Sequence, residues 1–66
     1  MIRPEQIKDA MNEPVRYEPA GGDGAGLYIL TGAIFRKNES GFYYQLELTN
    51  LRENSIVIAR LEDVNI

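Results

Sequence analysis

The sequence contains no cysteine, no histidine and no tryptophan, and these absences narrow what the protein can be. Without thiols and imidazoles it can form no disulfide, and it lacks the ligands from which structural zinc sites are built. The usual pairs of nucleophile and base are also missing, so only carboxylates, hydroxyls and lysines are left for catalysis. We therefore expect no cofactor, no metal and no enzymatic activity, and a fold that depends on its own apolar core or on oligomerisation.

Long apolar runs and blocks of like charge are absent as well. Residues 1–14 contain Pro, Glu, Lys and Asp where a secretory signal needs an unbroken apolar run, and no stretch approaches the roughly 20 apolar residues of a membrane span. We expect a cytoplasmic protein without membrane contact, and the lack of cysteine fits that compartment. The seven basic and ten acidic residues are spread along the chain and give a net charge of −3. Nucleic-acid-binding domains typically concentrate basic residues on one face instead.

The 66 residues predict a single small domain that is α+β and mainly β. A helix is expected at about residues 4–12, strands at about 15–18, 27–37, 42–50 and 55–61, and a flexible glycine-rich loop at 19–26. The short N-terminal helix would be followed by a four-stranded antiparallel sheet or meander. Such a sheet suits a small SH3-like or OB-like partly open barrel, and a flatter sheet with the helix across one face is the alternative.

Prolines mark the ends of the first two elements. Pro4 occupies a favoured position in the first helical turn, and Pro14 ends the helix near Asn12 because the residue before a proline avoids the helical region. The strand at 15–18 lies between Pro14 and Pro19. Proline cannot donate to a β ladder, so this strand is expected at an edge of the sheet.

Two longer segments are apolar on both faces. The strand at 27–37 is interrupted by Gly32, and glycine inside a strand often marks a bulge or a sharp bend, so we expect a curled sheet. Ser55–Leu61 is almost continuously apolar. Because unpaired backbone groups beside apolar side chains invite another chain, this last strand should be central, covered, or the seam of a homodimer. The C-terminal tail is expected to pack back through Val64 or Ile66.

The segment Asn38–Gly41 predicts a tight turn between two strands. Asparagine begins a type I turn and Gly41 supplies a positive φ, as in a three-residue hairpin loop with a G1 bulge. This register places Lys37 opposite Tyr43 and Arg36 opposite Tyr44, whereas a four-residue loop would shift the pairing by one residue and exchange the faces. One face of the strand after the turn is apolar and is expected in the core: Phe42, Tyr44, Leu46 and Leu48.

Five residues could form a binding surface on the sheet: Arg16, Tyr17, Arg36, Lys37 and Tyr43. Aromatic side chains beside Arg and Lys are how OB-like and RRM-like sheets stack bases, with Tyr43 as the stacking residue here. The same pattern also covers the end of an ordinary hairpin, with aliphatic stems lying on the ring. Tyrosine is equally suited to a protein interface, and the acidic net charge weakens attraction to a phosphate backbone.

Other candidates for chemistry are weaker. Glu47 with Glu62 or Asp63 could form a carboxylate pair, but isolated glutamates on a strand usually belong to a solvated face. A domain of this size also has little volume for a pocket. The glycine-rich loop lacks the lysine and hydroxyl of a phosphate-binding loop and leads into a strand. Asp23 alone is not a calcium site, because calcium takes several oxygen ligands at set spacing.

The sequence therefore predicts a small non-enzymatic binding or regulatory protein of a bacterial or phage type. It would act through protein contacts, either at a β-edge or through an exposed aromatic surface. The expected partner is another protein, including a second copy of the chain paired through Ser55–Leu61. The alternative is a nucleic-acid-binding β module that uses Arg, Lys and Tyr on one face of its sheet.

Overall fold

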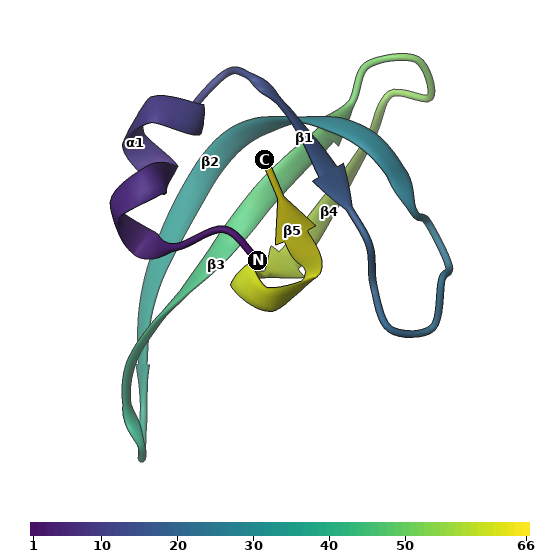
Figure 1. Cartoon of the computed structure of the whole chain (residues 1–66). Coiled ribbons are helices and arrows are strands. Elements are labelled where there is room, and N and C mark those ends of the chain that lie inside the picture. Colours follow the sequence, from purple (N-terminus) through teal and green to yellow (C-terminus); the bar gives the residue numbers. More distant parts are fainter.

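The structure is a computed structural model of residues 1–66, with a short N-terminal helical segment and an open antiparallel sheet of five strands (Figure 1). In chain order the elements are the 3-10 turn η1 (Pro4–Gln6), α1 (Ile7–Ala10), β1 (Pro14–Tyr17), β2 (Gly26–Asn38), β3 (Gly41–Asn50), β4 (Ser55–Arg60), the 3-10 turn η2 (Leu61–Asp63) and β5 (Val64–Asn65). The strand order is β4-β3-β2-β1-β5, so β4 and β5 are the two edges. The expected N-terminal helix and mainly β, antiparallel architecture are confirmed, but the expectation of four strands is wrong by one. None of the helices has the length and apolar character needed to cross a lipid bilayer.

The helical segment begins and ends with recognisable local signals. Pro4 stands at its first position, and the Arg3 N–H donates to Oε1 of Gln6 at 2.9 Å, which supports the chain at the helix start. The helix ends at Ala10, slightly earlier than expected. The chain leaves the helix at Met11, whose ψ of 130° is extended, and Asn12 follows with a φ of 66°, a left-handed conformation that asparagine tolerates.

The core lies between this helical segment and one face of the sheet, called the core face below; the opposite face is the outer face. Ten buried side chains form the core, all of them apolar or aromatic: Ile2, Ile7, Ala10, Val15, Tyr28, Leu30, Leu46, Leu48, Ala59 and Val64. Two backbone hydrogen bonds hold the end of the helical segment against β2. The Asn12 N–H donates to O of Leu30 at 2.7 Å, and the Leu30 N–H donates to O of Glu13 at 3.1 Å. Figure 1 accordingly shows α1 against β2.

The two ends of the chain meet at this core (Figure 1). Ile2 and Val64 are both fully buried, and the Ile2 N–H donates to O of Val64 at 2.6 Å. Val64 begins β5, which pairs with Arg16 and Tyr17 of β1. The expectation that β1 is an edge strand is therefore wrong, because a two-residue strand from the C-terminus covers it. The tail packs back through Val64, while Ile66 stays exposed.

A bulge in β2 explains why this strand is apolar on both faces. Its pairing with β3 shifts between Leu30 and Gly32, so Thr31 is the extra residue. Before the bulge Leu30 points into the core; after it, Ala33 lies on that side, opposite the buried Leu46. The bend expected near Gly32 is thus present as a bulge, which changes the set of alternate residues that face the core.

The hairpin between β2 and β3 differs by one residue from the three-residue-loop register. The observed pairs at its end are Asn38 with Gly41, Lys37 with Phe42, and Arg36 with Tyr43. Lys37 thus lies opposite Phe42, as expected for the alternative four-residue loop. One further pair, Asn38 with Gly41, forms beyond it, toward the turn. Gly41 has the expected positive φ, at 125°, and Oδ1 of Asn38 accepts the N–H of Ser40 at 2.8 Å.

β3 has the alternation that its sequence predicts, and β4 forms an open edge. Leu46 and Leu48 are fully buried and Tyr44 is half-buried on the core face. Phe42 lies on the same side but is exposed, because the core ends before it. β4 pairs only with β3 and is therefore not central, contrary to the first of the three expectations for this strand.

Candidate functional site

β2 and β3 continue beyond their neighbours and form a projecting hairpin (Figure 1). β1 pairs with β2 only over Gly26–Ile29, and β4 pairs with β3 only over Gln45–Asn50. Residues 35–44 therefore form a two-stranded ribbon without a third strand beside it. This ribbon is called the hairpin arm below. A two-stranded ribbon cannot bury its own apolar side chains well, so it leaves them open to a partner.

Three aromatic side chains gather on the side of the hairpin arm that continues the core face. The rings of Phe35 and Phe42 are stacked, with centroids 5.0 Å apart and planes 8° apart, and the Tyr44 centroid lies 5.0 Å from that of Phe35. Nζ of Lys37 lies 5.7 Å from the Phe42 centroid, within reach of a cation–π interaction. Nevertheless Phe35 is 59% exposed and Phe42 is 66% exposed. Most of this aromatic surface is available for contact.

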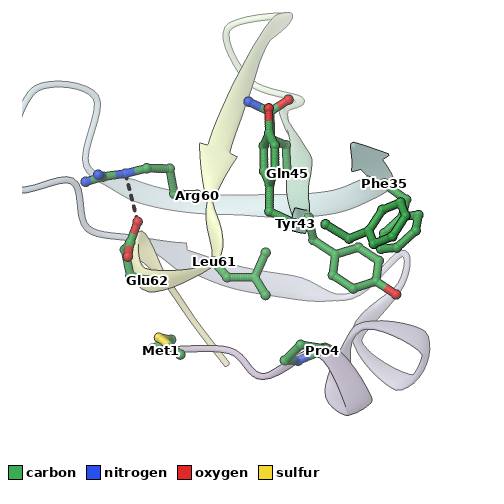
Figure 2. Close-up of a pocket in the computed structure, with 10 residues that line it drawn as sticks. Met1, Pro4, Phe35, Tyr43, Gln45, Arg60, Leu61 and Glu62 are labelled. Atoms are coloured by element: carbon green, nitrogen blue, oxygen red, sulfur yellow. Dashed lines mark ion pairs between the residues drawn. The ribbon is translucent and has the colours of Figure 1, made fainter. Parts of the chain in front are cut away.

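The aromatic cluster forms one wall of an open groove of about 500 Å³, called the aromatic groove below. Its lining residues, drawn in Figure 2, are Met1, Pro4, Phe35, Phe42, Tyr43, Tyr44, Gln45, Arg60, Leu61 and Glu62. The groove lies where β4 ends at Arg60 and the chain turns into η2, so Leu61 and the N-terminal residues complete its lining. This volume falls within the range of sites that bind small ligands. It corrects the expectation that so short a chain has little room for a pocket.

The backbone of β3 is unpaired along this groove. Gly41–Tyr44 pair with β2 on one side, whereas on the other side β4 stops at Arg60, which lies opposite Gln45. The outward N–H and C=O groups of this stretch have no strand partner, so an extended segment could join the sheet here in line with β4. The groove thus combines exposed apolar side chains with unpaired backbone groups that can form hydrogen bonds.

Charges of opposite sign flank the groove. On the η2 side, Nε of Arg60 lies 3.1 Å from Oε1 of Glu62 and 3.3 Å from Oδ2 of Asp63, as Figure 2 shows for Glu62. The hydrogen bond to Asp63, followed by the charges of Asp63 and Glu62, raises the pKa of the Arg60 guanidinium. On the arm side, Arg36 and Lys37 take part in none of the ion pairs of the chain. The η2 side is therefore slightly acidic, and the arm is slightly basic.

Three of the five residues predicted as a binding surface lie together on the hairpin arm. Arg36 and Tyr43 are direct cross-strand partners on the outer face. Lys37 is on the other side of the arm, where it pairs with Phe42 and not with Tyr43, because of the shifted register. The arm thus presents Arg beside Tyr on one side and Lys beside Phe on the other.

The remaining two predicted residues are not near this arm. Arg16 and Tyr17 belong to β1, which pairs with the first residues of β2. Arg16 lies opposite Leu27 in this pairing. Tyr17 packs edge to face against Tyr28, with ring centroids 5.6 Å apart, and so lies at the margin of the core. The structure therefore does not combine these two residues with Tyr43 into one surface.

The carboxylates considered for catalysis are engaged in separate places. Oε2 of Glu47 accepts the hydroxyl hydrogen of Thr31 at 2.6 Å on the outer face of the sheet. Glu62 and Asp63 both contact Arg60 instead. The chain also has no cluster of three or more acidic side chains that could hold a metal ion. Glu47 therefore does not form the carboxylate pair with Glu62 or Asp63 that the sequence suggested.

Sequence reasoning placed Phe42 and Tyr44 in the core and did not find the aromatic groove. A usable signal was the difference in strand length, since the expected strands at 27–37 and 42–50 are longer than those at 15–18 and 55–61. Long strands beside short ones must project beyond them. The apolar residues at their far ends then cannot share the common core.

No protein-family model, curated protein or solved structure matches the chain. Conclusions about function therefore depend on the chemistry of the groove and of the sheet edges.

Proposed function

We propose that the protein is a small, non-enzymatic binding protein that holds an extended segment of a partner protein in the aromatic groove. The observation that carries this proposal is the exposed, stacked pair of Phe35 and Phe42 beside the unpaired backbone of β3. Strand addition obtains affinity from main-chain hydrogen bonds and specificity from pockets for alternate side chains. Aromatic residues are also the side chains most enriched at the centres of protein interfaces.

The charges beside the groove suggest the composition of such a segment. An apolar or aromatic side chain of the segment would lie against Phe42 and Leu61. An acidic residue would be favoured near Lys37, which lies over Phe42 and has no ion-pair partner within the chain. These rim charges would contribute mainly to orientation and association rate, because exposed ion pairs add little affinity.

A displayed library of random peptides, selected on the immobilised protein, tests this proposal. Selected peptides should share an apolar anchor and should shift the backbone amide signals of residues 41–45 in NMR titrations. Phe42→Ser should weaken their binding by about tenfold or more, because it removes a principal apolar contact. Leu51→Ser is the control, since Leu51 is also a large exposed apolar side chain and lies on the turn between β3 and β4. Its binding should match that of the unchanged protein.

Peptides that bind equally well to both variants would place the contact elsewhere and contradict the proposal. The alternative of a nucleic-acid-binding module has one supporting observation, the cross-strand pair of Arg36 and Tyr43 on the outer face. Short single-stranded oligonucleotides at low salt are therefore included as a second ligand. Binding of oligonucleotides that decreases steeply with salt, without selection of any peptide, would favour that alternative.

We also infer that the sheet is of the small, partly open barrel type described as SH3-like or OB-like. The support is its meander of consecutive strands β1 to β4, with short turns between β2 and β3 and between β3 and β4, and a bulge that bends β2. This likeness concerns architecture alone and carries no argument about function.

A further inference from the structure

Most of the edge strand β4 lacks the proline, charge and bulge by which proteins usually protect an open edge, and its single charged residue, Arg60, stands at its end. It spans Ser55–Arg60 and pairs without interruption to β3, so it contains no bulge that would twist it away. The stretch Ser55–Ala59 contains no proline and no charged residue. Natural edge strands normally carry at least one of these features, because their unpaired N–H and C=O groups otherwise recruit another strand.

The outer face of this edge is also apolar. Ile56 is 63% exposed and Ile58 is 50% exposed, and they occupy alternate positions of the same strand. Single exposed apolar residues are normal, but neighbouring ones beside unpaired backbone indicate a contact surface. This surface is separate from the aromatic groove, which begins where β4 ends.

The sequence of β4 indicates what covers it. Around Val57 the strand reads Ser-Ile-Val-Ile-Ala, so an isoleucine lies on each side of the central valine and a small residue lies beyond each isoleucine. A two-fold axis requires that residue i contacts residue j while j contacts i. A strand whose sequence is nearly the same in both directions meets this condition against its own copy.

We propose that two copies of the chain pair antiparallel through β4 about a two-fold axis at Val57, which joins their sheets into one continuous sheet. Ile56 then lies opposite Ile58 of the partner subunit, and Ser55 lies opposite Ala59 of the partner subunit. An axis at Ile58 would instead place Ile56 against the Arg60 guanidinium of the other copy. An axis at Ile56 would place Ile58 against Asn54 of the other copy, so the axis at Val57 is the one of the three that matches apolar with apolar and small with small. It places no two like charges opposite each other.

Because the chain has no cysteine, the register can be read by introducing thiols. Ile56→Cys and Ile58→Cys are made separately, one of them with an affinity tag, and oxidised in a glutathione buffer alone and as a mixture. With the axis at Val57, position 56 lies directly opposite position 58, at a Cβ separation of about 4.5 to 5.5 Å, close to disulfide reach. Like positions lie diagonally, about 7 to 8 Å apart, which is too far. The mixture should therefore form tagged–untagged disulfide dimers much faster than either variant alone.

Sedimentation equilibrium tests the dimer itself, without any cross-link. We expect a concentration-dependent dimer whose Kd rises by about tenfold or more in Ile58→Lys, because an ammonium group would be placed against an apolar side chain. Ile66→Lys is the control, since Ile66 is also an exposed isoleucine and lies beside β5 at the other edge of the sheet. It should leave the Kd unchanged.

Three results would overturn the proposal. The first is a protein that stays monomeric up to millimolar concentration. The second is a dimer weakened equally by Ile58→Lys and Ile66→Lys. The third is rapid cross-linking of Ile58→Cys by itself, which would place the axis at Ile58. None of these results depends on whether the aromatic groove binds a peptide, so the two proposals can fail separately.

Discussion

The tip of the hairpin arm offers a direct test of the turn, because its glycine is required by backbone conformation alone. Gly41 has a φ of 125°, and a Cβ placed on it would meet no atom within 4 Å. Any cost of Gly41→Ala therefore comes from holding an L-residue in a region of φ that such residues rarely occupy. Backbone strain of this kind costs about 1 to 3 kcal/mol. Gly41→Val, which adds β-branching, should cost at least as much.

Gly21 provides a matched control within the same chain. A Cβ at this position also meets no atom within 4 Å, but Gly21 does not have a positive φ. Gly21→Ala should therefore be neutral or should stabilise the protein by about 0.4 to 1 kcal/mol, because alanine restricts the unfolded chain more than glycine does. The two substitutions add the same atom in equally open space, and only Gly41→Ala should destabilise the protein.

Thermal unfolding followed by circular dichroism measures the difference. For a chain of this length, each kcal/mol corresponds to a change in Tm of roughly 4 to 8 °C. A chain of 66 residues is also accessible to chemical synthesis, which allows Gly41→D-Ala. A D-residue prefers positive φ, so this third variant should be at least as stable as the natural protein. Equal Tm values for Gly41→Ala and Gly21→Ala would show that the turn geometry has been misassigned.

Two further predictions concern the facial assignment of β3 and the turn that follows it. Leu46→Ala should lower the free energy of unfolding by about 2 to 5 kcal/mol, because Leu46 is fully buried. Tyr43 is exposed, so Tyr43→Ala should lower it by less than about 1 kcal/mol. Similar losses for both variants in urea titrations would refute the assignment. Asn50→Ala should cost about 1 kcal/mol, since Oδ1 of Asn50 accepts the N–H groups of Arg52 at 3.0 Å and Glu53 at 3.1 Å, and an unchanged Tm would mean that these bonds contribute nothing.

The parts of the fold that could be predicted were those encoded locally. The strict alternation after Gly41 correctly identified Leu46 and Leu48 as core residues, because a period of two specifies one buried face. Gly32 correctly marked a distortion in the long strand. The helix start at Pro4 and a positive φ at Gly41 also follow from short-range backbone preferences.

The hairpin register could not be derived in the same way. A three-residue loop over 39–41 and a four-residue loop over 38–41 differ little in turn chemistry, and normally the hydrophobic pattern decides between them. Here the bulge at Thr31 exchanges the faces of β2 midway, so both parities of its sequence are apolar and neither register is preferred. A residue that is extra in one strand can be recognised only when its partner strand is known.

The order of the strands in the sheet could not be predicted from the sequence for a different reason. β5 consists of two residues, which is too short for any periodic signal, and its place beside β1 depends on contacts between the two ends of the chain. The buried side chains of Ile2 and Val64 create that contact, across almost the full length of the sequence. Pairing of such distant residues follows from the closure of the core and not from local preference.

Unequal strand length accounts for both surfaces on which the proposals rest. β2 and β3 are the longest strands, while β1, β4 and β5 are too short to flank them over their whole length. The far end of the long hairpin therefore extends past the core and leaves Phe35 and Phe42 without cover. The short β4 in turn ends the sheet with Ile56 and Ile58 on its surface. Within residues 1–66 no segment covers either place, and burial of these apolar side chains against another chain would be favourable, which is the physical basis of both proposals.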